Sequence, residues 1–157
     1  MSKTRDIDIQ IVIEGPLESV YQAWLKPAIL ERWLARGARV EPALGGAYEL
    51  FWDPKDPSKN CTVGCRITGL VPNREISFSW KGPEEHAEVM GDKTQVFVRL
   101  EACEGGTLLR FVHTGWGAGE RWEKARAWQA AAWQEAIENL KNLLENTEKI
   151  THNLSMN

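Results

Sequence analysis

A long amphipathic segment near the C-terminus decides which folds this chain can adopt. Between about residues 119 and 145, apolar side chains recur at the spacing of one helix face. They are Trp122, Ala125, Trp133, Ala136, Ile137, Leu140, Leu143 and Leu144. Such a stripe must pack against another layer, because a lone helix cannot bury it. The chain has 157 residues and the pattern weakens near its end, so we expect one domain over residues 1–146 and a frayed tail over 147–157.

Segments that alternate apolar and polar residues supply the second layer. They predict strands over residues 7–14, 48–52, 61–71, 74–80, 94–102 and 106–113. A turn rich in Asp and Pro, residues 53–58, separates the second of these from the third, and the other connections are short. We expect the third strand to face inward through Val63, Cys65 and Ile67. Short connections favour an antiparallel arrangement.

Two short helices are expected between the first and second strands. Pro16 is a good first helical residue, and the apolar residues that follow recur every three or four positions until Pro27. A second helix is predicted over residues 28–34. The predicted fold is therefore α+β: a curved antiparallel sheet of about six strands wrapped around the long C-terminal helix. A sheet that bends around a helix leaves room for a cavity between them, and we expect function to lie there.

Charge and cysteine content exclude several classes of protein. Lys and Arg number 19 against 22 Asp and Glu, a net charge of −3, whereas a protein that binds nucleic acid normally carries a basic excess. No segment approaches the ~20 apolar residues of a membrane span, and the first residues lack the apolar stretch of a secretory signal. Cys61 and Cys65 would lie ~13 Å apart along a strand, too far for a disulfide. We therefore expect a cytoplasmic protein.

Tryptophan is unusually abundant, with eight Trp against four Phe and two Tyr. Pockets for small ligands are lined mainly by such rings together with a few polar groups. Arg126 and Gln129 fall between Trp122 and Trp133 on the buried side of the long helix, although Arg126 could equally lie at the edge and reach solvent. His113 is expected inward, as a structural or a functional histidine. The candidate ligand-binding residues are Trp33, Tyr48, Trp52, Trp80, His113, Trp122, Arg126 and Gln129.

No catalytic or metal-binding motif stands out. The chain lacks a nucleophile elbow, a His-Glu-x-x-His pair, a phosphate-binding lysine loop and a Cys and His cluster with metal-ligand spacing. The segment Glu84-Glu85-His86 is expected to be a solvated loop. We expect neither a metal nor another cofactor, and the catalytic residues, if there are any, stay unknown.

Several segments together resemble a known superfamily. Residues 15–24, 30–33 and 45–48, then 76–80, 106–109, 113–116 and 133–144, are similar in order and character to the START-like helix-grip (SRPBCC) superfamily. The resemblance is to the branch that includes the C-terminal domain of the activator of heat-shock protein 90 ATPase. It implies a sheet around a C-terminal helix and a hydrophobic cavity, and it supplies no shared catalytic residues.

Three functions follow as hypotheses. The first is binding of a small hydrophobic or aromatic molecule between sheet and helix, by a protein that is non-catalytic or of unknown activity. The second is an enzyme of the cyclase, dehydratase or hydrolase type acting on a carbonyl compound, with His113 as acid or base and Arg126 stabilising an oxyanion. The third is an interaction module that modulates a chaperone ATPase, although we expect this protein to lack the co-chaperone's separate N-terminal domain. A homodimer is possible, because Trp116 or Trp128 could be exposed.

Overall fold

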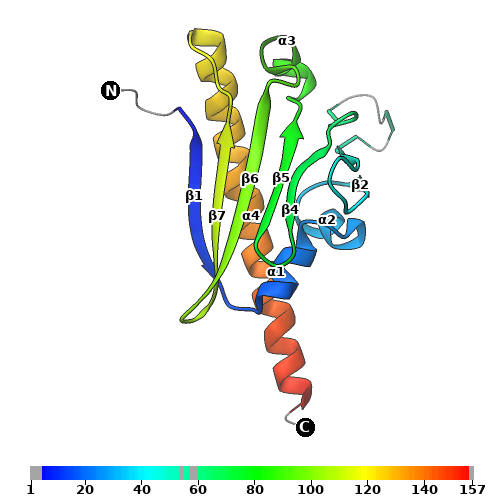
Figure 1. The fold of residues 1–157 in the computed structure, drawn as a ribbon, viewed down its shortest axis with the longest axis vertical. Coiled ribbons are helices and arrows are strands. Elements are labelled where there is room, and N and C mark those ends of the chain that lie inside the picture. The colour runs from blue at the N-terminus through cyan, green and yellow to red at the C-terminus, as the bar shows by residue number, and fades with distance from the viewer. Residues whose placement is uncertain (1–4, 54, 57–59, 156–157) are drawn as a thin grey trace.

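The computed structural model describes residues 5–53, 55–56 and 60–155, with side chains described up to residue 146. The elements are β1 (Ile7–Ile13), α1 (Leu17–Ala23), α2 (Pro27–Trp33), β2 (Gly37–Val40), β3 (Tyr48–Phe51), β4 (Ile67–Val71), β5 (Glu75–Trp80), η1 (Glu84–His86), α3 (Ala87–Met90), β6 (Thr94–Cys103), β7 (Gly106–Thr114) and α4 (Glu120–Ser155). The predicted α+β class is confirmed. In the described part of the chain, an antiparallel sheet of five strands packs on α4, and α1 and α2 follow β1 (Figure 1).

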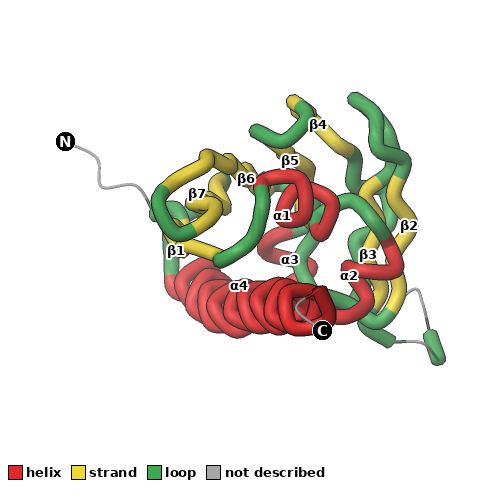
Figure 2. The backbone as a smooth tube through the Cα atoms, turned by 90° about the horizontal axis from the view of Figure 1, so that it is seen from below, coloured by secondary structure: helices red, strands yellow, loops and turns green. Residues whose placement is uncertain are grey.

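The sheet brings the first and last strands together. Its order is β1-β7-β6-β5-β4, so β1 pairs with β7 at one edge, from Ile7 opposite His113 to Ile13 opposite Thr107. Seen from below, the sheet bends over α4, with α2 and the β2–β3 hairpin beside the edge formed by β4 (Figure 2). Alternate residues of β5, β6 and β7 are buried, as the apolar–polar alternation that predicted these strands requires. Alternation works here because one face of each strand packs on the helix.

An aromatic cluster fills much of the space between sheet and helix. Trp24, which follows α1, is fully buried, and its ring lies 4.7 to 6.3 Å from the rings of Trp33, Phe78, Phe111 and Trp133. Rings at such distances attract one another beyond the effect of burial itself. The centre of the sheet–helix interface is therefore solid core.

The prediction of one strand over residues 61–71 is wrong in its first half. Only β4, from Ile67, is a strand, and Val63, expected to face inward, is 45% exposed. Residues 62–65 form a turn instead, in which the Cys65 amide donates to the Thr62 carbonyl and Gly64 adopts a positive φ of 92°. The Thr62 hydroxyl holds this turn against β3, because it accepts a hydrogen bond from the Leu50 amide at 2.8 Å.

The partner of β3 was also not predicted. β3 pairs with β2, four residues that carry no clear alternation, and the two form a separate small sheet. The predicted turn at residues 53–58 lies partly outside the described residues; within it, the Lys55 amide donates to the Asp53 carboxylate. Residues 84–86, expected to be a solvated loop, form η1, and α3 follows directly.

Helix α4 runs past the end expected from its apolar pattern. It continues to Ser155, and its C-terminal turns extend beyond the sheet (Figure 1). Loss of apolar periodicity shows where a helix stops packing on a core, and helical hydrogen bonding can continue past that point. A domain boundary at residue 146 stays a prediction. Among the described helices, none is both long enough and apolar enough to cross a membrane.

Candidate functional site

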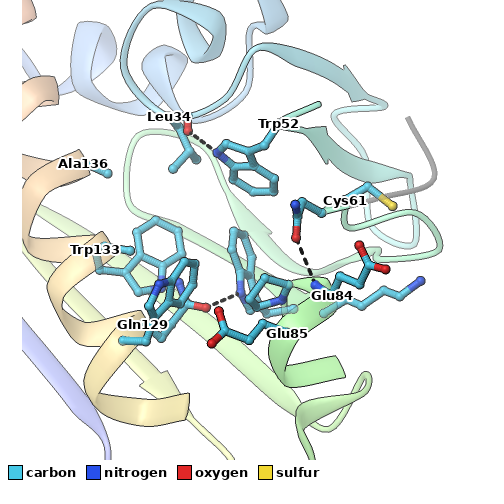
Figure 3. A pocket seen from close by; sticks show the side chains of 14 residues that line it. Leu34, Trp52, Cys61, Glu84, Glu85, Gln129, Trp133 and Ala136 are labelled. Carbon is cyan, nitrogen blue, oxygen red and sulfur yellow. Dashed lines mark hydrogen bonds between the residues drawn. The ribbon is translucent and has the colours of Figure 1, made fainter. Parts of the chain in front are cut away.

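A cavity of about 590 Å³ lies beside the aromatic cluster, between α4, the end of β5, η1 and the segment after α2 (Figure 3). Sites for small organic ligands commonly have volumes of ~300 to 1,000 Å³. Four indole rings line this cavity together with small or aliphatic side chains. The tryptophans are Trp52, Trp80, Trp128 and Trp133, and the other apolar residues are Leu34, Pro83, Ala132 and Ala136.

Hydrogen bonds to the protein hold three of the four indoles. Trp52 Nε1 donates to the Leu34 carbonyl at 2.8 Å, which ties the end of the hairpin to the end of α2. Trp133 Nε1 donates to His113 Nδ1 at 3.0 Å. Trp80 packs against Trp133 with ring centroids 4.8 Å apart and against Trp52 at 5.9 Å. Because their N–H groups are satisfied, these rings offer apolar carbon surface to the cavity.

Gln129 is the polar group set deepest in this wall. Its side chain is on α4, the residue is only 4% exposed, and its Oε1 accepts from Trp80 Nε1 at 3.2 Å (Figure 3). An indole N–H can only donate, so the amide oxygen must face Trp80 and the amide NH₂ must face the other way. That NH₂ has no hydrogen-bond partner in the described part of the chain. Gln129 therefore offers hydrogen-bond donors to a molecule in the cavity.

Charged residues stand at the mouth. Lys81, Glu84 and Glu85 line the cavity there, and the backbone N–H of Glu84 donates to Asn60 Oδ1 at 3.0 Å. Glu84 and Glu85 are exposed, as expected for this segment, but they belong to η1 and border the cavity. Figure 3 shows the Glu85 carboxylate turned toward the Gln129 side of the cavity and the Glu84 carboxylate turned toward Cys61.

Histidine 113 lies in the core and does not line the cavity. It is fully buried at the end of β7, and its ring lies 4.8 Å from that of Trp116. Its Nδ1 accepts from Trp133, so the proton of the neutral ring is on Nε2, which has no partner among the described residues. Burial lowers the pKa of His113 to about 3, because desolvation disfavours the charged imidazolium. This histidine is therefore neutral near pH 7.

Tyr48 and Trp33 also belong to the core and not to the cavity wall. The Tyr48 hydroxyl donates to the Trp24 carbonyl at 2.7 Å, and its ring stacks on Phe78 at 4.0 Å. Burial raises the pKa of Tyr48 well above its usual value. Trp33 Nε1 donates to the Ala23 carbonyl at 3.0 Å. Both residues are fixed by the fold and leave no polar group for a ligand.

Trp122 and Arg126 lie nearer the start of α4, away from the cavity. Trp122 packs edge to face on Trp116 at 6.1 Å, and Lys93 lies over its ring. The Arg126 guanidinium donates to the backbone carbonyls of Arg5 and Asp6, so it reaches the edge of the helix and not the interior. Of the eight candidates, Trp52, Trp80 and Gln129 line the cavity, and the other five do not.

Sequence reasoning missed several residues of the wall. Trp128 was expected only as a residue that could be exposed, yet it lines the cavity, one turn before Ala132 and two turns before Ala136, which line it too. That i, i+4, i+8 spacing is the signal that could have identified it. The residues at the mouth had no such signal, because η1 is too short to show a period.

The described residues hold no grouping of three or more His, Cys, Asp or Glu side chains that could bind a metal ion. Cys61 lines the cavity, while Cys65 is buried, and burial raises the pKa of the Cys65 thiol to about 11. A thiol with so high a pKa is a poor nucleophile at neutral pH. The cavity thus combines apolar walls, one buried amide and a charged mouth.

A bent antiparallel sheet around a long C-terminal helix, with a cavity between them, defines a helix-grip protein of the START-like (SRPBCC) superfamily. The family described as Activator of Hsp90 ATPase homolog 1-like protein matches residues 14–145, and the chain belongs to that family. The search of curated proteins found no relative of significant similarity.

Solved structures share the fold over nearly the whole chain. A Mesorhizobium loti protein matches with a TM-score of 0.74 at 22% identity, covering 91% of this chain and 98% of its own. A Colwellia psychrerythraea structure described as an Aha1 dimer matches with a TM-score of 0.70 at 23% identity, covering 89% and 96%. A Staphylococcus aureus protein of unknown function matches with a TM-score of 0.73 at 15% identity, covering 94% and 97%. At these identities the likeness concerns the fold.

Proposed function

We propose that this protein binds a small, mostly apolar molecule that carries a hydrogen-bond acceptor, in the cavity beside α4, and that it does so without catalysing a reaction. The observation that carries the proposal is the unpartnered amide NH₂ of Gln129 in a wall otherwise made of tryptophan rings. Apolar surface supplies affinity in proportion to the area removed from water. The amide then selects ligands with an acceptor, because a ligand that covers this donor without pairing with it loses ~1 to 3 kcal/mol.

The position of His113 favours binding over catalysis. A general acid or base must come within hydrogen-bond reach of the proton that it transfers. His113 does not line the cavity, its Nδ1 is taken by Trp133, and its pKa of about 3 leaves it neutral. Arg126, the expected oxyanion partner, is bonded to backbone carbonyls at the other end of the interface. The carbonyl-enzyme hypothesis therefore gains no support from these two side chains.

The family description provides a second candidate, modulation of a chaperone ATPase. It rests on the family match over residues 14–145 and on no surface feature of this chain. Measuring the ATPase rate of Hsp90 with and without this protein tests it directly. With either candidate we propose a cytoplasmic location, because a chain with few cysteines fits a reducing compartment.

Titration with prodan tests the binding proposal. Prodan is a neutral naphthyl ketone whose emission moves to the blue in apolar surroundings, so it matches both the rings and the amide. We expect saturable binding of one molecule per chain, and Gln129→Leu is expected to weaken it about fivefold, from a hydrogen bond worth ~1 kcal/mol. Gln134→Leu is the matched control, because Gln134 is an exposed amide on the same helix.

Two results would contradict the proposal. The first is the absence of saturable binding to the wild type, and the second is equal weakening by Gln129→Leu and Gln134→Leu. Urea denaturation of each variant separates a lost contact from a lost fold, since Gln129→Leu also removes the acceptor of Trp80. Native mass spectrometry of the same samples measures whether the chain forms a dimer.

A further inference from the structure

The mouth of the cavity combines aromatic rings with an excess of negative charge. We propose, building on the binding function above, that the ligand is an organic cation: an apolar or aromatic body inside the cavity and a positive group at the mouth. The carboxylates of Glu84 and Glu85 would face that positive group. Trp128, which is 45% exposed and lines the same cavity, would offer its ring face. The negative face of an indole attracts ammonium groups, and tryptophan is the best side chain for this contact.

The two carboxylates are available to a ligand. Among the described residues, neither Glu84 nor Glu85 makes an ion pair, whereas Glu88, on the following helix α3, pairs with Arg121 at 3.1 Å. Lys81 is the one cation that lines the cavity in the described part of the chain, so the charged wall has a net charge of about −1. An anionic ligand would meet two like charges at this mouth, and a cation would meet one.

Gln129 supplies a hydrogen-bond donor behind this mouth for the inner end of a ligand that enters the cavity. It is almost fully buried, its NH₂ lacks a partner in the described structure, and Glu85 is turned toward its side of the cavity (Figure 3). An acidic loop that is simply solvated would not border a buried side chain with an unpaired hydrogen-bond donor. The proposed ligand thus carries an acceptor for Gln129 at its inner end and a positive charge at its outer end.

Three probes that have nearly the same shape and different charges separate the effect of ligand charge from the effect of ligand shape. Benzyltrimethylammonium is the cation, neopentylbenzene is its uncharged carbon analogue, and benzylsulfonate is an anion with a similar tetrahedral head. Tryptophan fluorescence measures the affinity of each for the wild type, for Glu84→Gln/Glu85→Gln, for Lys81→Gln and for Glu88→Gln. Glu88→Gln is the matched control, because Glu88 is an exposed carboxylate on the adjoining helix that does not line the cavity.

We expect the ammonium to bind more tightly than the sulfonate. The double glutamine variant should weaken ammonium binding about fivefold, since each exposed charge pair contributes ~0.2 to 1 kcal/mol. Binding of neopentylbenzene should stay unchanged in that variant, and Lys81→Gln should strengthen binding of the ammonium. Raising the salt concentration should weaken binding of benzyltrimethylammonium and leave binding of neopentylbenzene unchanged.

The results separate this inference from the function on which it depends. If neopentylbenzene binds but the sulfonate binds as well as the ammonium, or Glu88→Gln weakens the ammonium as much as the double variant does, the cation inference is overturned and the cavity function stands. If neither prodan nor any of the three probes binds, both are overturned.

Discussion

Filling the cavity from α4 should raise stability and abolish binding together. Ala132 lines the cavity and is half-buried, and Ala132→Leu adds three carbon atoms toward the space between the indoles. Burial is worth ~0.8 kcal/mol per carbon, or at most ~2.4 kcal/mol for three. Ordering the leucine side chain costs ~0.5 to 1 kcal/mol of this. We therefore expect the free energy of unfolding to rise by about 1.5 kcal/mol.

The same side chain takes space that a ligand needs. Forcing both into one cavity costs ~1 to 3 kcal/mol, which corresponds to a loss of about fivefold or more in affinity for prodan. Urea denaturation measures the first effect and prodan titration the second. Ala131→Leu is the control, because Ala131 is exposed on the same turn of α4, and both quantities should stay at their wild-type values.

An open cavity is distinguished from packed core by an increase in the free energy of unfolding together with a decrease in the affinity for prodan. In a packed core, the larger residue would cost stability instead of adding to it. A less stable Ala132→Leu variant, or one that binds prodan as the wild type does, would refute the reasoning.

Three further predictions concern the residues around the cavity. Since the pKa of His113 is about 3 when folded and ~6.5 when unfolded, the unfolded chain takes up a proton that the folded one does not, and the free energy of unfolding should fall by up to ~1.4 kcal/mol per pH unit as the pH drops from 6.5 toward 3. This pH-dependent loss of stability should be missing in His113→Gln. If the free energy of unfolding depends on pH in the same way in the wild type and the variant, the prediction is contradicted. Trp133→Phe leaves His113 Nδ1 without its donor and should lower stability by ~1 to 3 kcal/mol, measured in urea; an unchanged midpoint would count against the hydrogen bond. Arg126→Ala removes the hydrogen bonds to the Arg5 and Asp6 carbonyls, so it should speed hydrogen exchange at the start of β1 without changing the affinity for prodan. A loss of prodan affinity would instead indicate that Arg126 contacts the ligand.

Much of the sheet could be predicted because one of its faces packs on a helix. Val98 and Phe111 alternate with exposed or half-exposed neighbours along β6 and β7, and each is buried as its spacing predicted; Phe78 on β5 is buried too, although its neighbour Ser77 is also buried. β3 lies within the strand predicted over residues 48–52, but its partner β2, which is four residues long, was not predicted. Four residues are too few to show a period, and their pairing depends on contacts with residues 61–66 that the local sequence does not encode.

The residues that line the cavity were harder to predict, because periodicity gives the direction of a side chain and not its position along the interface. Trp122, Arg126 and Gln129 lie on one side of α4, yet only Gln129 is level with the cavity. His113 points inward as expected, but Trp133 caps it with a hydrogen bond, and the indole, not the imidazole, forms the wall. Which part of the interface stays open depends on how the rings around Trp24 pack, and this is decided by the whole fold.

The indole N–H signals in a proton–nitrogen correlation spectrum test the central claim most directly. Titration with prodan should move most strongly the signals of the cavity tryptophans, assigned by single Trp→Phe variants: Trp52, Trp80, Trp128 and Trp133. The signals of the tryptophans outside the cavity should move little: Trp24, Trp33, Trp116 and Trp122. A spectrum that does not change, or one in which Trp116 and Trp122 move most, would contradict a ligand site in this cavity.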